Sequence, residues 1–284
     1  MQEKKNLIAT VSGGRSSVRV IEHLENSEKY ADFNKVYVFN NTGQERHETF
    51  KFMQEAEKTW GVEIIKIEGV YHKSFEEGTS YRIVDKWEDL DTESNVFSEM
   101  IAYKNLGVFE GLPNIGSPYC SEMLKTRPTK KLGNDIFGQG NFNISIGFRR
   151  EDMPKRISWA EIKEEKRLIY PLITDFESPV DNFELNKFYE KQPFKLEIHN
   201  KFGNCRYCFK KSEDIIVENI RFDIEKGNLE TIEWYKKEEK KYGKLFFRKN
   251  KSIEELVKLA EQPTVGTLNF DKEEDFKCVC NYKI

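Results

Sequence analysis

Apolar and polar residues follow one another along the first part of the chain in a pattern that predicts strands separated by helices. An apolar run at residues 7–11 stops at a Ser-Gly-Gly turn, and apolar residues then recur at helical spacing over residues 18–24. A second strand pattern at residues 35–39 precedes a helical pattern at residues 50–60. Gly61 is the expected cap of that second helix, because glycine accepts the left-handed conformation that ends many helices.

Further strand patterns complete the predicted sheet, at residues 62–67, 143–147 and 167–172. Strands that alternate with helices of this length predict an α/β fold, with a mainly parallel sheet and helices on both faces. Residues 70–115 are irregular and acidic, which fits either a substrate-shaping insertion or a helical connection whose aromatic residues enter the core. We expect a first domain at residues 1–174 that carries this insertion, and a smaller, mostly helical, cysteine-bearing region at residues 175–284.

The composition is that of a folded and highly charged protein. Aromatic residues make up 13% of the 284 residues, so wholesale disorder is not expected. The net charge of −3 gives no overall attraction for nucleic acid, so a polyanion site would have to be local. No apolar stretch approaches the length of a bilayer and no apolar signal region follows Met1, so we expect a cytoplasmic protein without a membrane partner.

The turn after the first strand has the residues of a phosphate cradle. Gly13 and Gly14 let the backbone approach an anion, and the N–H groups that begin a helix have no internal partners. The hydroxyl groups of Ser12, Ser16 and Ser17 add donors, and the Arg15 guanidinium adds a planar cation. An N-capped turn without a ligand is the alternative, because Ser-Gly-Gly is a common sequence.

Two other polar segments follow strands and are expected at the same edge of the sheet. Ligands of such sheets lie beyond the carboxyl ends of the strands, where the turn with Thr42, Gly43 and Glu45 should meet the first turn. A later strand ends in a cationic segment that suits a second anion site, and an exposed charged loop would look similar. Its candidate residues are Arg149, Arg150 and Arg156.

The five cysteines favour metal or redox chemistry over disulfides in a reducing compartment. Cys205 and Cys208 form a Cys-x-x-Cys pair, and Cys278 and Cys280 form a Cys-x-Cys pair near the end of the chain. Cys120 precedes a predicted helix and nearby cations, which would lower the pKa of its thiol. A buried, inert cysteine is the alternative at that position.

The segment from Lys236 to Lys251 holds eight cations and two acids, with Tyr242, Phe246 and Phe247 between them. Such a segment suits contact with the backbone of a tRNA or DNA acceptor. A solvated helix face is the commoner explanation of this pattern.

Read together, these motifs resemble the phosphoadenosine phosphosulfate (PAPS) reductase family of the PP-loop, or adenine nucleotide α-hydrolase-like, superfamily. The resemblance covers nearly the whole chain. It rests on the order of the matching segments, which are Ser12-Gly13-Gly14-Arg15-Ser16-Ser17, Asn41-Thr42-Gly43-Gln44-Glu45, Cys120 to Pro128, Ile146 to Arg150 with Arg156, Tyr170-Pro171-Leu172, and Gly203-Asn204-Cys205 to Ser212.

The resemblance implies roles for these residues. The turn from Ser12 to Ser17 would hold the phosphates of ATP or another adenine nucleotide, with the turn from Thr42 to Glu45 beside it. The three arginines would face the phosphate or sulfate end of the substrate. The ligands of a [4Fe–4S] cluster would be Cys120, Cys205, Cys208 and one of Cys278 and Cys280, of which we take Cys280.

Two classes of function follow from the resemblance and the residues. The first is an enzyme of sulfur chemistry, which either reduces a sulfonucleotide or cleaves ATP between the α- and β-phosphates and transfers sulfur to a nucleic acid. The second is a non-catalytic, regulatory nucleotide-binding protein whose cysteines hold structural zinc. A homodimer is left open as the assembly.

Overall fold

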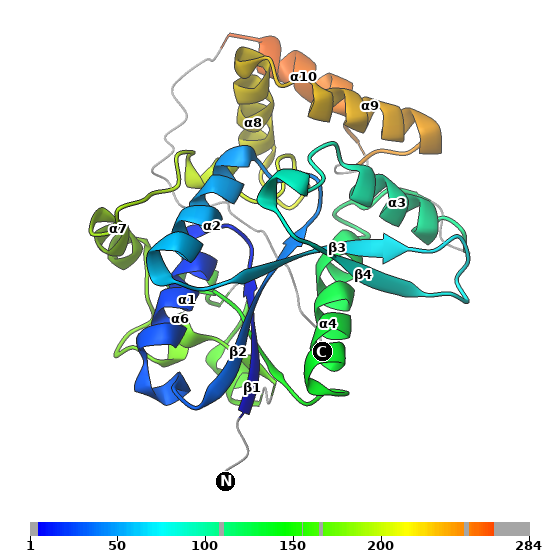
Figure 1. Cartoon of the computed structure of the whole chain (residues 1–284). Helices are drawn as coiled ribbons and strands as arrows, with labels where there is room; N and C mark the ends of the chain where they lie inside the picture. Colours follow the sequence, from blue (N-terminus) through cyan, green and yellow to red (C-terminus); the bar gives the residue numbers. More distant parts are fainter. Residues whose placement is uncertain (1–4, 108–110, 155, 165–166, 247–249, 264–284) are drawn as a thin grey trace.

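The computed structural model describes residues 5–107, 111–154, 156–164, 167–246 and 250–263. Within these ranges one six-stranded sheet has the order β4-β3-β2-β1-β5-β6, and every neighbouring pair is parallel except β3 with β4 (Figure 1). The strands are β1 Lys5–Val11, β2 Phe33–Asn41, β3 Ile64–Tyr71, β4 Thr79–Val84, β5 Asn143–Ser145 and β6 Leu168–Ile169.

Helices cover both faces of the sheet, because each central strand is apolar on both sides. Along β1, Leu7 and Ala9 belong to the core under α1 (Arg15–Asn26) and α2 (His47–Trp60), whereas Ile8 packs in the core under α4 (Arg127–Phe137). The predicted α/β fold with a mainly parallel sheet is therefore confirmed. Gly61 caps α2 in the left-handed conformation, as the sequence predicts.

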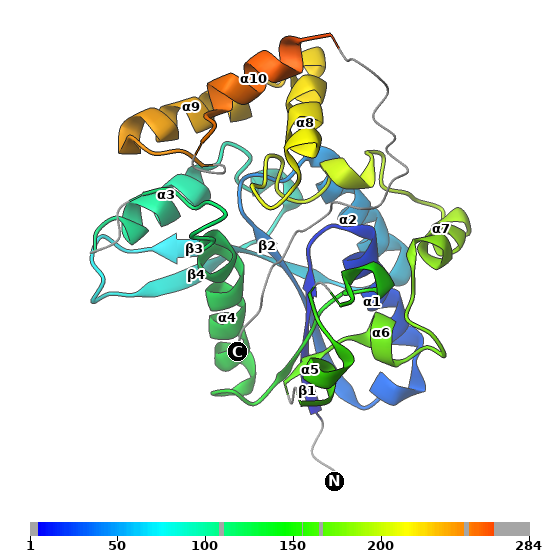
Figure 2. The same ribbon diagram turned by 180° about the vertical axis from the view of Figure 1, so that it is seen from behind.

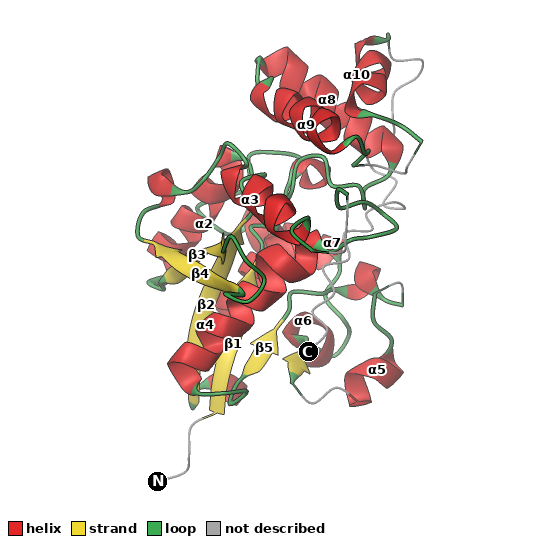
Figure 3. Ribbon diagram, turned by 90° about the vertical axis from the view of Figure 1, so that its right-hand side faces the viewer, coloured by secondary structure: helices red, strands yellow, loops and turns green. Residues whose placement is uncertain are grey.

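The C-terminal region is helical, also as predicted. Helices α8 (Glu213–Lys226), α9 (Glu230–Tyr242) and α10 (Ile253–Glu261) form a layer at the end of the molecule opposite the N-terminus (Figures 1 and 2). Seen from the side, β1 and β2 run toward this layer, so the carboxyl ends of the strands face it (Figure 3). No helix in the described part of the chain has the length and apolar character to cross a membrane.

The segment at residues 70–115 contains regular structure that the sequence did not reveal. β4 forms an antiparallel edge strand, and α3 (Asn95–Lys104) follows it. Arg82 and Ile83, on the two faces of this strand, are both exposed, so its residues do not alternate between apolar and polar and no strand pattern stood out. α3 packs its apolar residues against the C-terminal helices, as the helical alternative for this segment expects.

The two large cores of the structure do not divide at residue 174. α7 (Asn182–Glu190) contributes Leu185 and Tyr189 to the core that also contains α1 and α2. The other core joins Phe97 of α3 to the aromatic residues of the C-terminal helices. The remaining helices are α5 Trp159–Glu164 and α6 Pro171–Thr174.

Candidate anion site at the carboxyl ends of the strands

The turn between β1 and α1 is a compact network of hydroxyl and backbone groups. The Ser12 N–H donates to Ser17 Oγ at 3.0 Å, and Ser17 Oγ donates to the Gly14 carbonyl at 2.9 Å. Gly14 is the N-cap of α1, and no side chain caps the helix or places an acid in its first turn. The N–H groups that begin α1 therefore keep the positive potential that attracts an anion.

The two glycines of this turn have different reasons to be glycine. Gly13 has a φ of +74°, and a Cβ there would lie 2.1 Å from Thr49 Cγ2 of α2. Gly14 has an ordinary φ, and a Cβ there would meet Asn204 Oδ1 at 3.6 Å, an ordinary contact. A side chain at Gly13 would thus disturb the packing of the fold, whereas one at Gly14 would enter the space beside Asn204.

Arg15 and Arg149 bring two positive charges together at this turn. Burial lowers the pKa of Arg15, and the positive charge of Arg149 lowers it further, while the Tyr189 hydroxyl acts in the opposite direction. Arg15 donates to Asn186 Oδ1 at 2.5 Å, and Arg149 forms an ion pair with Glu151 at 3.2 Å. Two guanidinium groups beside an uncapped helix N-terminus suit a doubly charged anion such as a phosphate.

A close backbone contact explains why Arg149 lies beside Arg15. Gly147 follows β5, and a Cβ on it would lie 2.6 Å from Ser17 Cα. Only glycine lets the end of β5 approach the start of α1 so closely. This contact brings together two segments that are separated by about half of the chain.

The three predicted arginines have separate environments. Arg149 is the one whose positive charge, together with burial, lowers the pKa of Arg15. Arg150 is 67% exposed, and its Nη1 lies 3.6 Å from Asp181 Oδ2. Arg156 donates to Asp152 at 2.7 Å, and its guanidinium lies over the Phe148 ring. We therefore place Arg149 at the anion site and treat Arg150 as its matched surface control.

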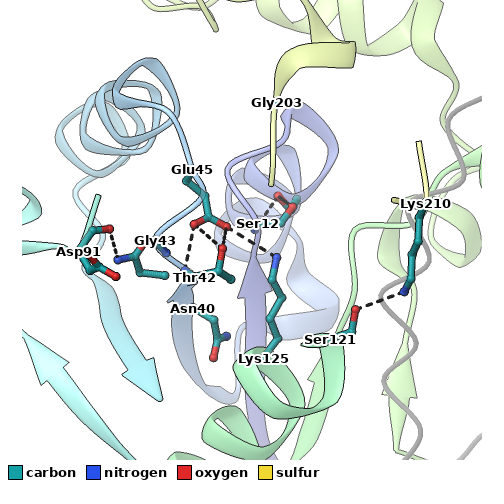
Figure 4. A network of polar contacts seen from close by, with 12 residues as sticks. Ser12, Asn40, Thr42, Gly43, Glu45, Asp91, Ser121, Lys125, Gly203 and Lys210 are labelled. Carbon is teal, nitrogen blue, oxygen red and sulfur yellow. Dashed lines mark hydrogen bonds and ion pairs between the residues drawn. The ribbon is translucent and has the colours of Figure 1, made fainter. Parts of the chain in front are cut away.

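The turn with Thr42, Gly43 and Glu45 is held by its own hydrogen bonds. The Glu45 carboxylate accepts from the Thr42 N–H at 2.9 Å and from Thr42 Oγ1 at 2.8 Å. Gly43 has a φ of +75°, and a Cβ there would lie 2.7 Å from Ser94 Cα. Lys125 Nζ lies 3.9 Å from Glu45 Oε1, and Figure 4 shows Glu45 beside Ser12 with the Lys125 side chain reaching toward it from below. The two predicted turns thus lie side by side, and the buried Glu45 carboxylate has an ammonium group near it.

Asn204 is a candidate site residue that our sequence-based site prediction did not include. It has a φ of +58°, and its Oδ1 is buried without a hydrogen-bond partner in the described part of the chain. Its loop is anchored on the second turn, because the Arg206 N–H donates to the Gln44 carbonyl at 3.1 Å. An asparagine after Gly203, in a segment rich in turn residues, is the sequence signal for this left-handed position.

Two of the three described cysteines of the predicted metal site, Cys120 and Cys205, pack against the core that contains Tyr235. Burial raises the pKa of Tyr235 well above its usual range, and Cys205, Cys208 and Cys120 raise it further. Burial also raises the pKa of the Cys205 thiol, and the Glu45 carboxylate and Cys120 add to this effect. The protein fold therefore joins Cys120 to the Cys-x-x-Cys pair, beside the second turn.

The arrangement of these thiols does not itself make a metal site. Among the described residues, no group of three or more His, Cys, Asp or Glu side chains is placed to hold a metal ion. Cys278 and Cys280, which supply the predicted fourth ligand, lie outside the described residues. The [4Fe–4S] cluster and its zinc alternative remain predictions, and no chemical step below depends on them.

Comparisons with known proteins add a relative without an assigned function. No family model matches the chain. An uncharacterized nin region protein, ORF290, of Escherichia phage lambda is 30% identical over 207 residues, which cover 72% of this chain and 66% of that protein. A crystal structure of PAPS reductase from Candida auris, a phosphate complex, has a TM-score of 0.38 and 13% identity over 67% of this chain and 74% of that one.

Proposed function

We propose that the chain binds an adenine nucleotide, with its phosphates at the turn between β1 and α1. The observation that carries this proposal is the close packing of Gly147 on Ser17 at the start of α1, which brings the segment with Arg149 to the turn that holds Arg15. Besides burial, the positive charge of Arg149 also lowers the pKa of Arg15, so an anion at this turn would be favourable. The uncapped start of α1 supplies backbone donors on the same side. The resemblance of the motifs to the PAPS reductase family supports adenine as the base.

We further propose that the protein is an enzyme of sulfur chemistry. Reduction of a sulfonucleotide and cleavage of ATP with sulfur transfer both develop negative charge at a phosphate or sulfate. Preorganised N–H groups and arginines stabilise such charge more in the transition state than in the ground state. In this proposal Arg15, Arg149 and the N–H groups at the start of α1 hold the anion, and the Asn204 amide lies beside Gly14 to orient it.

Equilibrium binding of ATP, AMP and PAPS tests the nucleotide site directly. Arg149→Gln removes a charge-assisted hydrogen bond, so affinity for nucleotides with a phosphate chain should fall at least about tenfold, or about 1.5–3 kcal/mol. Arg150→Gln removes the same charge from an exposed position and should bind like the wild type. Equal affinities for wild type and Arg149→Gln would remove the proposal.

The reaction products separate the versions of the proposed enzyme. Sulfite released from PAPS would identify a reductase, and AMP with pyrophosphate released from ATP would identify an adenylating sulfurtransferase. Nucleotide binding without either product would favour the regulatory alternative. Metal and sulfide analysis of anaerobically purified protein, with Cys205→Ser as its control, tests the predicted cluster or zinc independently of activity.

A further inference from the structure

We propose that the exposed face of α9 binds the sugar-phosphate backbone of a nucleic acid. Lys237, Lys240 and Lys241 are exposed at positions that share one face of the helix, and Lys244 follows just after the cap at Gly243. None of these four ammonium groups forms an ion pair with a residue that the structure describes. Four uncompensated cations on one face are complementary to a chain of phosphates.

The two acids of the segment from Lys236 to Lys251 are buried on the other side of the helix. Glu238 is 2% exposed and accepts from Ser98 Oγ at 3.1 Å. Glu239 is also buried and accepts from the backbone N–H groups of Phe246 and Ile253. Cations near a helix C-terminus are common because of the helix dipole, but the dipole does not require the acids to point inward. The face from Lys237 to Lys244 is thus more basic than the composition of residues 236–251, and the exposed Glu233 one turn earlier pairs with Lys236.

Buried aromatic residues decide how a nucleic acid would be contacted. Phe246 is 1% exposed and packs against Trp234 and Tyr235 inside the helical layer. It is therefore not available to stack on a base, contrary to the aromatic interleaving in the sequence pattern, and Phe247 lies outside the described residues. Tyr242 is half-buried against the same core, with Lys241 Nζ 5.0 Å from the centre of its ring. The contact should therefore read mainly phosphates, and we expect little sequence preference.

Lys244, at the end of this basic face, lies near the segment that precedes Cys120. The Lys244 side chain lies against Gly111, whose carbonyl accepts from the Tyr119 hydroxyl at 3.0 Å. Lys104 Nζ lies 5.7 Å from the centre of the Tyr119 ring, which adds another cation beside this segment.

Fluorescence anisotropy with labelled single-stranded DNA and RNA of about 20 nucleotides tests this contact without any added nucleotide. The variant K237Q/K240Q/K241Q/K244Q should lose at least about tenfold in affinity, and its logarithmic salt dependence should weaken by about three. The four corresponding Lys→Arg changes should restore binding, because they keep the charge. The DNA and RNA arms show which backbone is preferred.

A matched control distinguishes the effect of the α9 lysines from the effect of the overall net charge on binding. Four exposed lysines elsewhere, changed in K58Q/K86Q/K191Q/K195Q, give the same change in formal charge from −3 to −7 and should bind nearly like the wild type. Arg149→Gln should also bind normally, so a failure of the nucleotide site is distinguishable from a failure here. Absence of wild-type binding, equal losses in both quadruple variants, or equally tight binding of polyglutamate would overturn the proposal.

Discussion

Arg15 and Arg46 occupy comparable places in the fold but have opposite electrostatic surroundings. Each follows a parallel strand and lies at the start of a helix, α1 for Arg15 and α2 for Arg46. Arg46 is buried and donates through Nη1 and Nη2 to both oxygens of Asp223, which is also buried. Arg15 donates to the neutral amide of Asn186, and burial and the positive charge of Arg149 lower its pKa.

The presence or absence of a carboxylate partner distinguishes a structural cation from a candidate ligand-binding cation at the same edge of the sheet. The Arg46–Asp223 pair is complete within the chain, and it ties α2 to α8 of the C-terminal layer. Arg15 has no carboxylate partner in the described part of the chain, whereas Arg149 is paired with Glu151, and in our proposal an anion compensates the charge of Arg15. A buried guanidinium with a carboxylate partner is therefore expected to matter for stability, and a guanidinium without one for ligand affinity.

The largest expected effect comes from breaking the structural pair. Asp223→Asn leaves the Arg46 charge buried without a carboxylate, and it also weakens the bond from Tyr207 Oη. We expect a loss of about 3–5 kcal/mol in the free energy of unfolding, measured in urea. Asp181→Asn breaks the exposed pair with Arg150 while keeping a good N-cap for α7, and it should cost at most about 1 kcal/mol. Similar losses in both variants would contradict the comparison.

The gain in stability on binding nucleotide tests the role proposed for Arg15. A nucleotide at about 100 times its Kd should raise the free energy of unfolding of the wild type by about 2.7 kcal/mol. Arg15→Gln should lose most of this gain, yet be at least as stable as the wild type without ligand because the repulsion from Arg149 is removed. A variant that is destabilised without ligand would show that Arg15 is a structural cation.

Gly13 and Gly14 should also differ, because one affects the stability of the fold and the other the affinity for nucleotide. Gly13→Ala should cost about 1–3 kcal/mol in the free energy of unfolding, because of its positive φ and the contact with Thr49. Gly14→Ala should unfold like the wild type but bind nucleotide less tightly, because its methyl group enters the space beside Asn204. Parallel urea and binding measurements check both variants, and the reverse ranking of stabilities would contradict the geometry.

The smallest expected effect concerns Asp175, a fully compensated charge near the other end of α1. Burial alone would raise the pKa of Asp175, but hydrogen bonds from His23, Lys29 and Tyr30 offset it and hold the pKa below its usual range. Its folded-state pKa is thus lower than its unfolded-state value, so its contribution is present above about pH 4 and is lost as the pH falls. Asp175→Asn should lower stability by about 1 kcal/mol at neutral pH and flatten this acid-side loss. Unfolding in urea, measured across the acid range, checks this prediction. If Asp175→Asn had the same pH profile of stability as the wild type, the hydrogen bonds to Asp175 would not lower its pKa.

Local sequence signals predicted the framework on which the site is built. The β1 strand, the turn at Gly13 and Gly14, and the Gly61 cap of α2 depend on neighbouring residues and on backbone preferences, so they were readable without the fold. The alternation of strands and helices also placed two polar turns at one sheet edge. The edge strand β4 escaped prediction because its residues do not alternate between apolar and polar.

By itself, the sequence of this protein determined its α/β class, the Ser-Gly-Gly turn between the first strand and helix, and the set of arginines and cysteines from which a site is proposed. The tertiary structure decided which of them meet. Gly147 brings Arg149 rather than Arg150 to Arg15, the loop at Asn204 closes on the first turn, and Asp223 neutralises Arg46. The physical reason is that hydrophobic periodicity and backbone dihedral preferences act over a few residues. The partners of a buried charge, in contrast, lie more than 100 residues apart in the chain and meet only when the cores pack.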